Sequence, residues 1–409
     1  MTSIRLLADD LTGALDTAAE FVGLCGPFDV TWREALSTNR APSLAIDSGT
    51  REFAKAESAE IVGRLAPLLR EGTIAYKKVD SLLRGAWAAE LAACLRSGHW
   101  ASCVVAPAFD YQGRRTRDGQ QFARTPDGDW YPVGKHLLAQ LRAENIDARQ
   151  GGPDTLSHGD VQVFDAENDL DLDRVVEMGR RLAAPVLWCG SGGLAGALTR
   201  GSHADVPRHL KKPALGLFGS DQVVTASQLE ACGEATLMLT EGDAGSAARL
   251  HRKLADDGVA LVKFSLAEGL SRAEAARRIA REMTTLLAAL DPPGTLIVAG
   301  GETLKAVCVA LGAQALQVAG RLVPGLPRSI LQGGRWAGVD VISKSGAFGT
   351  RELWRDLLQD NQLLNTGKPT WPLAIWQSPW AIRRGSDRRS SSRPASDCRT
   401  GSQRAICAC

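Results

Sequence analysis

Residues 4–16 read IRLLADDLTGALD and join a short apolar run to the start of a helical pattern. The run Ile4–Ala8 has the length and composition of a buried strand, and residues 16–25 have the spacing of an amphipathic helix. Asp9 and Asp10 therefore lie at the carboxyl end of a strand, where open α/β sheets bind their ligands. One acid is enough to cap a helix, so two adjacent acids favour a functional site over a simple cap.

The same alternation of strand and helix continues to about residue 205. Further strands are predicted at 43–46, 73–77, 103–106, 161–164 and 186–189, and helices at 54–70, 86–95 and 171–183. Strands separated by helices favour a mostly parallel sheet. Residues 110–158 interrupt the pattern with Gly, Arg, Asp and Pro, so we predict an insertion of loops and short elements there.

A polar connector at residues 201–207 indicates a domain boundary near residue 205. The pattern then repeats, with strands predicted at 214–218, 236–239, 259–264, 295–299 and 339–343 and helices at 226–232, 244–256, 271–289, 303–310 and 350–358. We therefore predict an α/β protein of two domains, 1–205 and 206–365, with mostly parallel sheets and a cleft between them. Residues 366–409 are rich in Arg, Ser and Pro, and we predict a disordered basic tail.

Charge and composition exclude several classes of protein. The net charge of +2 combines +6 in residues 366–409 with −4 in the rest, and a mildly acidic body argues against nucleic-acid binding. No apolar run reaches the ~18 residues that span a bilayer, and the first residues do not resemble a secretory signal. Nine scattered cysteines indicate reduced thiols. We expect a cytoplasmic protein without a membrane or nucleic-acid partner; nucleic-acid binding by the Arg-rich tail is the alternative.

Three more motifs follow predicted strands in the first half. Residues 77–85 read KKVDSLLRG, and their lysines and arginine can bind an anion, with a solvated loop as the alternative. Residues 106–119, APAFDYQGRRTRDG, offer a second basic cluster. Residues 189–198, CGSGGLAGAL, form a glycine turn that can present backbone N–H groups to an anion or only serve the turn.

The second half has three glycine-bearing turns after strands. They are Gly219-Ser220-Asp221, the segment 299–303 (AGGET) and the segment 344–349 (KSGAFG). Such turns suit a nucleotide, because phosphates require close approach to the backbone. Each turn alone is a weak signal, and the prediction of a nucleotide site depends on their convergence.

Taken in order, these segments resemble the four-carbon acid sugar kinase family. Its members carry ADDLTGA-D, KK-DSTLRG, APAFP--GR and GSaGLA motifs, followed by a GS turn, a GGDT or GGET turn, a PG-P segment and K-GGFG. Counterparts of all of these occur in order over residues 4–350. Leu82 replaces a threonine of the family pattern, Asp110 a proline and Ala347 a frequent glycine, and the nucleotide turn reads GGETL instead of GGDTA.

The resemblance implies a kinase whose first domain binds a sugar acid such as threonate, erythronate or 3-oxo-tetronate. Its second domain would bind ATP with Mg²⁺, and phosphate would pass to the terminal C4 hydroxyl. The alternative is a non-catalytic nucleotide- or sugar-acid-binding protein of the same fold. The sequence leaves the Mg²⁺ ligands open, and also whether the protein is a homodimer.

Site residues follow from the matching motif positions. We expect Asp9 or Asp10 to orient and deprotonate the attacking hydroxyl. The residues expected at the sugar acid are Lys77, Lys78, Asp80, Ser81, Arg84 and Arg114. The residues expected at the nucleotide are Ser220, Gly300, Gly301, Glu302, Thr303, Gly346 and Gly349. Which aspartate acts as the base, and whether Lys77 or Lys78 meets the anion, stays open.

Overall fold

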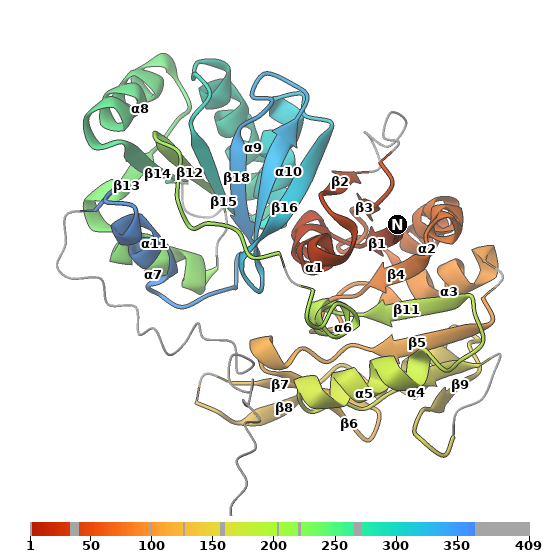
Figure 1. The fold of residues 1–409 in the computed structure, drawn as a ribbon. Helices are drawn as coiled ribbons and strands as arrows, with labels where there is room; N and C mark the ends of the chain where they lie inside the picture. Colours follow the sequence, from red (N-terminus) through yellow and green to blue (C-terminus); the bar gives the residue numbers. More distant parts are fainter. Residues whose placement is uncertain are drawn as a thin grey trace, which may run out of the picture. The chain divides into compact units, whose positions relative to one another are not determined.

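The strand Ile4–Ala8 belongs to a large sheet, and the strands that the first half of the chain contributes to this sheet are parallel. In spatial order these strands are β2 (Phe28–Trp32), β3 (Leu44–Asp47), β1 (Ile4–Ala8), β4 (Ile74–Lys78), β11 (Val186–Gly190), β5 (Ser102–Ala106), β10 (Val161–Val163) and β9 (Ala148–Gln150). Each neighbouring pair is parallel. Figure 1 shows β1, β4, β11 and β5 side by side.

This computed structural model describes residues 2–32, 41–98, 100–125, 127–155, 160–202, 204–219, 222–265 and 271–364. They belong to one compact unit, Met1–Pro369. The predicted disordered tail, 366–409, and Ser220 lie outside the described residues. The division into domains at residue 205 stays a prediction.

Helices connect the parallel strands and cover both faces of the sheet. They are α1 (Leu11–Cys25), α2 (Lys55–Leu65), α3 (Trp87–Ser97), α5 (Asp169–Gly179) and α6 (Gly192–Leu198). Successive residues of β1 enter different hydrophobic clusters: Leu6 packs with residues of α1, α5 and α6, and Leu7 with residues of α2 and α3. This is the alternation expected of a strand that is buried on both faces.

The second half contributes five more parallel strands. Their order is β13 (Thr236–Leu239), β14 (Val259–Phe264), β12 (Ala214–Phe218), β15 (Thr295–Ala299) and β18 (Asp340–Lys344). The helices are α7 (Val223–Ala231), α8 (Ala244–Asp257), α9 (Arg272–Ala288), α10 (Gly301–Ala310) and α11 (Leu353–Asp360). Four of the five strands have the predicted bounds, and the prediction of a mostly parallel α/β fold is confirmed. The cleft stays a prediction.

An antiparallel hairpin that the sequence did not predict joins the two parallel parts. It consists of β16 (Ala315–Val323) and β17 (Leu326–Gln332), with β17 antiparallel to β18 and β16 antiparallel to β2. Its turn contains Gly325 with φ 82°, a left-handed value that favours glycine. The hairpin makes all these strands one fifteen-stranded sheet.

The predicted insertion contains short elements. Strands β6 (Arg114–Arg117), β7 (Gln120–Arg124) and β8 (Trp130–Val133) form a separate antiparallel sheet, and α4 (Leu137–Arg142) precedes β9. Phe109 and Arg114 form an isolated antiparallel bridge at the start of this segment. The insertion therefore begins directly after β5.

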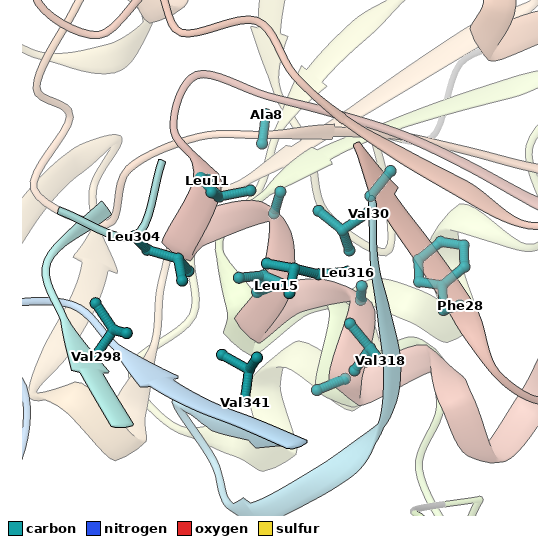
Figure 2. Close-up of a cluster of buried hydrophobic side chains, with 14 of the residues drawn as sticks. Ala8, Leu11, Leu15, Phe28, Val30, Val298, Leu304, Leu316, Val318 and Val341 are labelled. Carbon is teal, nitrogen blue, oxygen red and sulfur yellow. The ribbon is translucent and has the colours of Figure 1, made fainter. Parts of the chain in front are cut away.

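One buried cluster fixes the position of α1. Figure 2 shows Leu11 and Leu15 of α1 among Val30 of β2, Val318 of β16 and Val341 of β18. All five side chains are buried. Because these contacts come from distant segments, the turn that precedes α1 is held by the core of both halves.

We expect Leu15→Ala to lower the free energy of unfolding by about 2–5 kcal/mol, because Leu15 is fully buried and its removal leaves a cavity. Urea denaturation of both proteins measures the difference. Leu170→Ala, at a leucine that is more than half exposed, should change the same quantity by less than about 0.5 kcal/mol. Equal effects of the two substitutions would show that this core does not hold α1.

Candidate functional site

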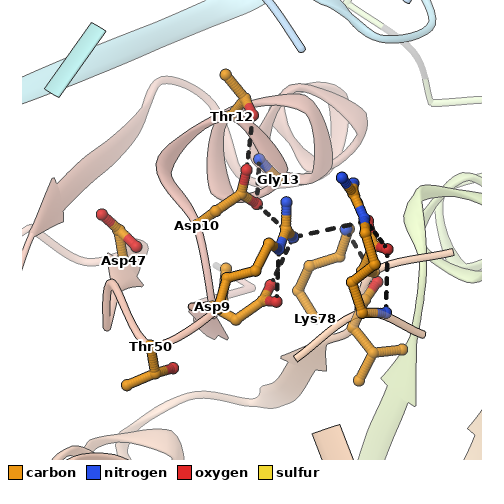
Figure 3. A network of polar contacts seen from close by, with 12 residues as sticks. Asp9, Asp10, Thr12, Gly13, Asp47, Thr50 and Lys78 are labelled. Atoms are coloured by element: carbon orange, nitrogen blue, oxygen red, sulfur yellow. Dashed lines mark hydrogen bonds and ion pairs between the residues drawn. The ribbon is translucent and has the colours of Figure 1, made fainter. Parts of the chain in front are cut away.

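Asp10 caps α1 and still faces the candidate site. Its Oδ1 accepts a hydrogen bond from the Gly13 N–H at 3.0 Å, and its Oδ2 accepts one from the Thr12 hydroxyl at 2.8 Å. Figure 3 shows these contacts at the start of the helix. The capping alternative thus applies to Asp10, whereas Asp9 takes no part in the cap and is paired elsewhere.

Arg51 forms ion pairs with the aspartates of this site, and it was not predicted as a site residue. It follows β3, and its guanidinium donates two hydrogen bonds of 2.8 Å to the two carboxylate oxygens of Asp9. Its Nη2 also lies 2.7 Å from Asp10 Oδ1 and 3.7 Å from Asp80 Oδ1. The signal was available, because β3 is the parallel neighbour of β1 and Arg51 lies just beyond its carboxyl end.

The charge of Arg51 controls the ionisation of Asp9. Burial alone would raise the pKa of Asp9, but Arg51, with further help from Lys77 and Lys78, holds this pKa below its usual value. Asp9 is therefore ionised at neutral pH, with both carboxylate oxygens engaged by one guanidinium. Such a bidentate pair fixes geometry and leaves little capacity to accept a proton.

The adjacent lysines at the end of β4 face different surroundings. Lys77 is fully buried, and its Nζ lies 2.8 Å from Glu90 Oε2 of α3. The Thr50 hydroxyl donates to the other oxygen of Glu90 at 2.6 Å. Lys77 thus belongs to a closed ion pair beneath the site.

Lys78 lies on the side of the aspartates, as Figure 3 shows. Its Nζ donates to the Val79 carbonyl at 3.0 Å and would be 3.2 Å from a Cβ added to Gly13. Its charge lowers the pKa of Asp9 and of Asp80. Among the described residues, no carboxylate oxygen lies within 4.0 Å of its ammonium group. This distinguishes Lys78 from Lys77, although both lysines are buried.

The turn after β4 holds Asp80 and Arg84 together. Arg84 donates two hydrogen bonds of 2.8 Å to the Asp80 carboxylate, which also accepts the N–H groups of Leu82 and Arg84 at 3.2 Å. Burial would raise the pKa of Asp80, but Arg84 and Arg51 hold it well below the usual range. Ser81 is buried, and its carbonyl accepts from Gln121 at 2.9 Å.

Arg114 brings a further cation toward this turn. Its Nη1 donates to the carbonyls of Gln112 and Gly113, and its buried Nε has no hydrogen-bond partner among the described residues. Burial lowers the pKa of Arg114, and the charges of Tyr131 and Asp80 oppose that shift. The first-half residues predicted from separate motifs thus lie around the carboxyl ends of β1 and β4.

Two more acids flank the site and were not predicted as site residues. Burial raises the pKa of Asp16, on α1, to about 6, although Lys78 opposes the shift. Burial also raises the pKa of Asp47, at the end of β3, to about 6, with Lys305 opposing. Asp47 accepts the Gly49 N–H at 2.7 Å and lies 3.4 Å from Lys305 Nζ.

The turn after β15 meets the aspartates. Gly300 caps α10 with a φ of 99°, and its N–H donates to the Lys344 carbonyl at 2.9 Å. A Cβ added to Gly301 would lie 3.4 Å from both Asp10 Oδ2 and Thr12 Oγ1. The amino ends of α1 and α10 are therefore in contact, and the predicted nucleotide turn lies next to the predicted catalytic acid.

The other predicted nucleotide residues surround this helix start. A Cβ on Gly219 would be 2.6 Å from Thr303 Oγ1, which places the turn after β12 against α10. The Gly346 carbonyl accepts the Thr225 hydroxyl at 2.7 Å, and Gly349 has a φ of 90°. Glu302 is exposed on the first turn of α10. Strands β12, β15 and β18 are neighbours, so these turns converge at one edge.

Comparisons with known proteins agree with this arrangement. A protein-family model described as a sugar-binding N-terminal domain matches residues 4–145. A second family model, described as a nucleotide-binding C-terminal domain, matches residues 215–353. The chain is 30% identical over 403 residues to a D-threonate kinase of Bordetella bronchiseptica, covering 86% of this chain and 95% of that protein. The chain belongs to the four-carbon acid sugar kinase family.

The chain is also similar to other kinases that act on four-carbon sugar acids. A D-threonate kinase of Cupriavidus necator is 31% identical, with 85% of this chain and 96% of that protein covered. A 3-oxo-tetronate kinase of the same organism is 29% identical over 41% of this chain and 37% of its own length. The resemblance found in the sequence motifs is confirmed, and the protein is an enzyme of the sugar acid kinase class.

Solved structures share the fold. A protein of Salmonella typhimurium LT2 matches with a TM-score of 0.70 at 21% identity, covering 87% of this chain and 98% of that one. A Haemophilus influenzae protein matches with a TM-score of 0.64 at 19% identity, covering 88% and 100%. These likenesses support the two-part α/β architecture.

The described residues also bear on the expectations about metal binding, membrane spanning and cysteines. They contain no group of three or more His, Cys, Asp or Glu side chains arranged to hold a metal ion. None of their helices combines the length and apolar character needed to cross a membrane. Their six cysteines are all free, and five of these are buried.

Proposed function

We propose that this enzyme transfers the γ-phosphate of ATP to the terminal C4 hydroxyl of a four-carbon sugar acid, with threonate, erythronate and 3-oxo-tetronate as the candidate substrates. The observation that carries the proposal is the contact between Gly301 and the Asp10–Thr12 turn. A donor phosphate at the start of α10 and an acceptor hydroxyl at Asp10 would then be neighbours, which is what phosphoryl transfer requires.

The sugar acid would bind among the residues of the first half. Lys78, Arg84 and Arg114 are the cations available for its carboxylate, and Arg84 is more than half exposed. Lys77 is neutralised by Glu90, so we assign the anion contact to Lys78. Asp80 and Ser81 would hold the turn that presents Arg84.

Asp10 is the better candidate for the residue that orients and deprotonates the hydroxyl. Both oxygens of Asp9 are bonded to Arg51, which lowers the pKa of Asp9. Asp10 Oδ2, in contrast, accepts from the Thr12 hydroxyl and faces Gly301 of the nucleotide turn. In this proposal Asp9 and Arg51 position Asp10, and they do not exchange protons with the substrate.

ATP would bind at the turns after β12, β15 and β18. The free N–H groups at the start of α10 and the glycines of these turns suit phosphate oxygens. Mg²⁺ would enter with the nucleotide and be held mainly by phosphate oxygens, as is usual for this ion. A cytoplasmic location is part of the proposal and rests on the six free cysteines of the described residues.

A screen for ADP release tests this function. The full chain is incubated with ATP, Mg²⁺ and each of the threonates, erythronates and 3-oxo-tetronates, and ADP is measured by a coupled assay. We expect at least one acid to raise ADP release far above the rate with ATP alone. ATP binding without release by any acid would favour the non-catalytic alternative.

We expect Gly301→Val to weaken ATP binding by at least about tenfold, because its side chain would enter the space between α10 and Asp10. Calorimetry with ATP measures the loss, and calorimetry with the sugar acid shows whether the first half still binds. Gly63→Val, on α2 at a glycine with open space around it, is the control. Unchanged ATP affinity in folded Gly301→Val would contradict this position of the nucleotide.

A further inference from the structure

Lys344, the last residue of β18, is a buried lysine that has no acidic partner among the described residues. Its side chain is 1% exposed, and its Nζ donates to the carbonyls of Ser345 and Gly346 at 3.0 and 3.2 Å. Among the described residues, no carboxylate oxygen lies within 4.0 Å of this ammonium group. A buried charge without a counter-charge is strongly unfavourable.

Lys77, in the same sheet, is a buried lysine whose charge is neutralised by an acid. It also lies near the carboxyl end of a parallel strand and is fully buried, but Glu90 lies 2.8 Å from its ammonium group. In the part of the chain that the structure describes, Lys344 has no equivalent of Glu90. The difference indicates that the counter-charge of Lys344 arrives from outside the protein.

Lys344 lies beside the start of α10 and the loop that follows β18. Its carbonyl accepts the Gly300 N–H at 2.9 Å, so the end of β18 is bonded to the cap of α10. α10 has ten residues, and its first N–H groups carry the positive end of the helix dipole. Thr225 of α7 fixes the Gly346 carbonyl at 2.7 Å, which holds the loop in place.

The acids of β18, α10 and α7 are engaged or exposed. Asp340, at the opposite end of β18, is paired with Arg328 and Lys211. Glu302, on the first turn of α10, is exposed, and Glu230 of α7 lies 3.9 Å from Arg351. None of these acids neutralises Lys344.

We propose that Lys344 is the phosphate-binding cation of the nucleotide site and that it acts together with the first N–H groups of α10. The inference rests on the proposed function, because it takes the nucleotide to bind in this half of the chain. A polyphosphate supplies the missing counter-charge, and Lys344 in turn neutralises a phosphate during transfer. The carbonyls of Ser345 and Gly346 hold the amino group of Lys344 in position before the nucleotide binds.

If Lys344 binds a phosphate of the nucleotide, the enzyme should take up a proton when the nucleotide binds. Burial lowers the pKa of Lys344 to about 7, so the amine is mostly neutral at about pH 8 in the free enzyme. A bound polyphosphate stabilises the charged form and raises this pKa. Binding of nucleotide at about pH 8 therefore takes up close to one proton, and affinity decreases as pH rises above about 7.

Calorimetry with a non-hydrolysable ATP analogue and the full chain tests the proposal. At about pH 8, in Tris and in HEPES, the difference in apparent binding enthalpy gives the number of protons exchanged. We expect the uptake of about 0.5–1 proton in the wild type and none in Lys344→Met, whose Kd should rise by at least about tenfold. Lys253→Met, at an α8 lysine paired with Asp257, is the matched control and should change neither quantity.

The outcomes separate the two proposals. Nucleotide binding with no proton uptake, or with an unchanged Kd in Lys344→Met, overturns the role of Lys344 and leaves the nucleotide site intact. No nucleotide binding by the wild type overturns both. The wild-type proton count needs no variant, so it decides even if Lys344→Met fails to fold; if it folds, its melting temperature should equal or exceed that of the wild type, which a structural lysine would not allow.

Discussion

Asp10→Asn is expected to lower kcat by about 10²- to 10⁴-fold, the usual contribution of a positioned general base. Asparagine is a good helix cap and can still accept the Gly13 N–H, so α1 should keep its start. The variant should therefore bind ATP nearly as well as the wild type. Steady-state kinetics and ATP calorimetry on the same preparation separate the two effects.

Asp9→Asn should not be equivalent. It breaks the bidentate pair with Arg51, so we expect a loss of stability together with a smaller loss of kcat. Asp243→Asn changes the acid that caps α8 through the Ser246 N–H, and it should leave kcat unchanged. If Asp9→Asn and Asp10→Asn both keep near-normal kcat, the base has been assigned to the wrong turn.

Arg51→Met is expected to destabilise the protein by about 3–5 kcal/mol at neutral pH, because it leaves Asp9 and Asp10 buried or half-buried without their counter-charge. Activity of the remaining folded protein should also fall, since Asp10 loses a contact that positions it. Denaturant unfolding at several pH values measures the effect, and Arg64→Met, at an exposed pair with Glu60, should change stability by less than about 0.5 kcal/mol.

The pH dependence of this difference has a defined sign. Arg51 holds the pKa of folded Asp9 below its unfolded value, so the stabilisation from this pair is complete above about pH 4. It is lost as pH falls through the lowered pKa of the folded state. The gap between wild type and Arg51→Met should therefore narrow in acid, and a gap that stays constant to the lowest pH would argue against the ion pair.

The strand–helix pattern predicted most of the fold, because buried parallel strands appear as short apolar runs. The hairpin of β16 and β17 was missed for a physical reason. Its strands alternate between buried and partly exposed residues, and Gly320 and Pro327 interrupt the pattern of each. Its role also depends on pairing with β2, which is far away in sequence and was likewise not predicted.

The site could be predicted only where several charged or polar site residues occur together in one short segment. Asp9 and Asp10 were found because two acids follow one strand, whereas Arg51 is a single charge whose importance comes from the order β3–β1–β4. Lys77 and Lys78 could not be told apart because the predicted strand ended at residue 77. Since β4 extends to Lys78, the two side chains point to opposite faces.

The position of the new phosphate tests the central claim most directly. The full chain, ATP, Mg²⁺ and the acid most active in the ADP-release screen are incubated, and the product is examined by phosphorus NMR with coupling to the carbon-bound protons. The account predicts a phosphate monoester on the terminal C4 oxygen, formed in equal amount to ADP. ADP formed with only inorganic phosphate, or a phosphate on another oxygen of the acid, would contradict it.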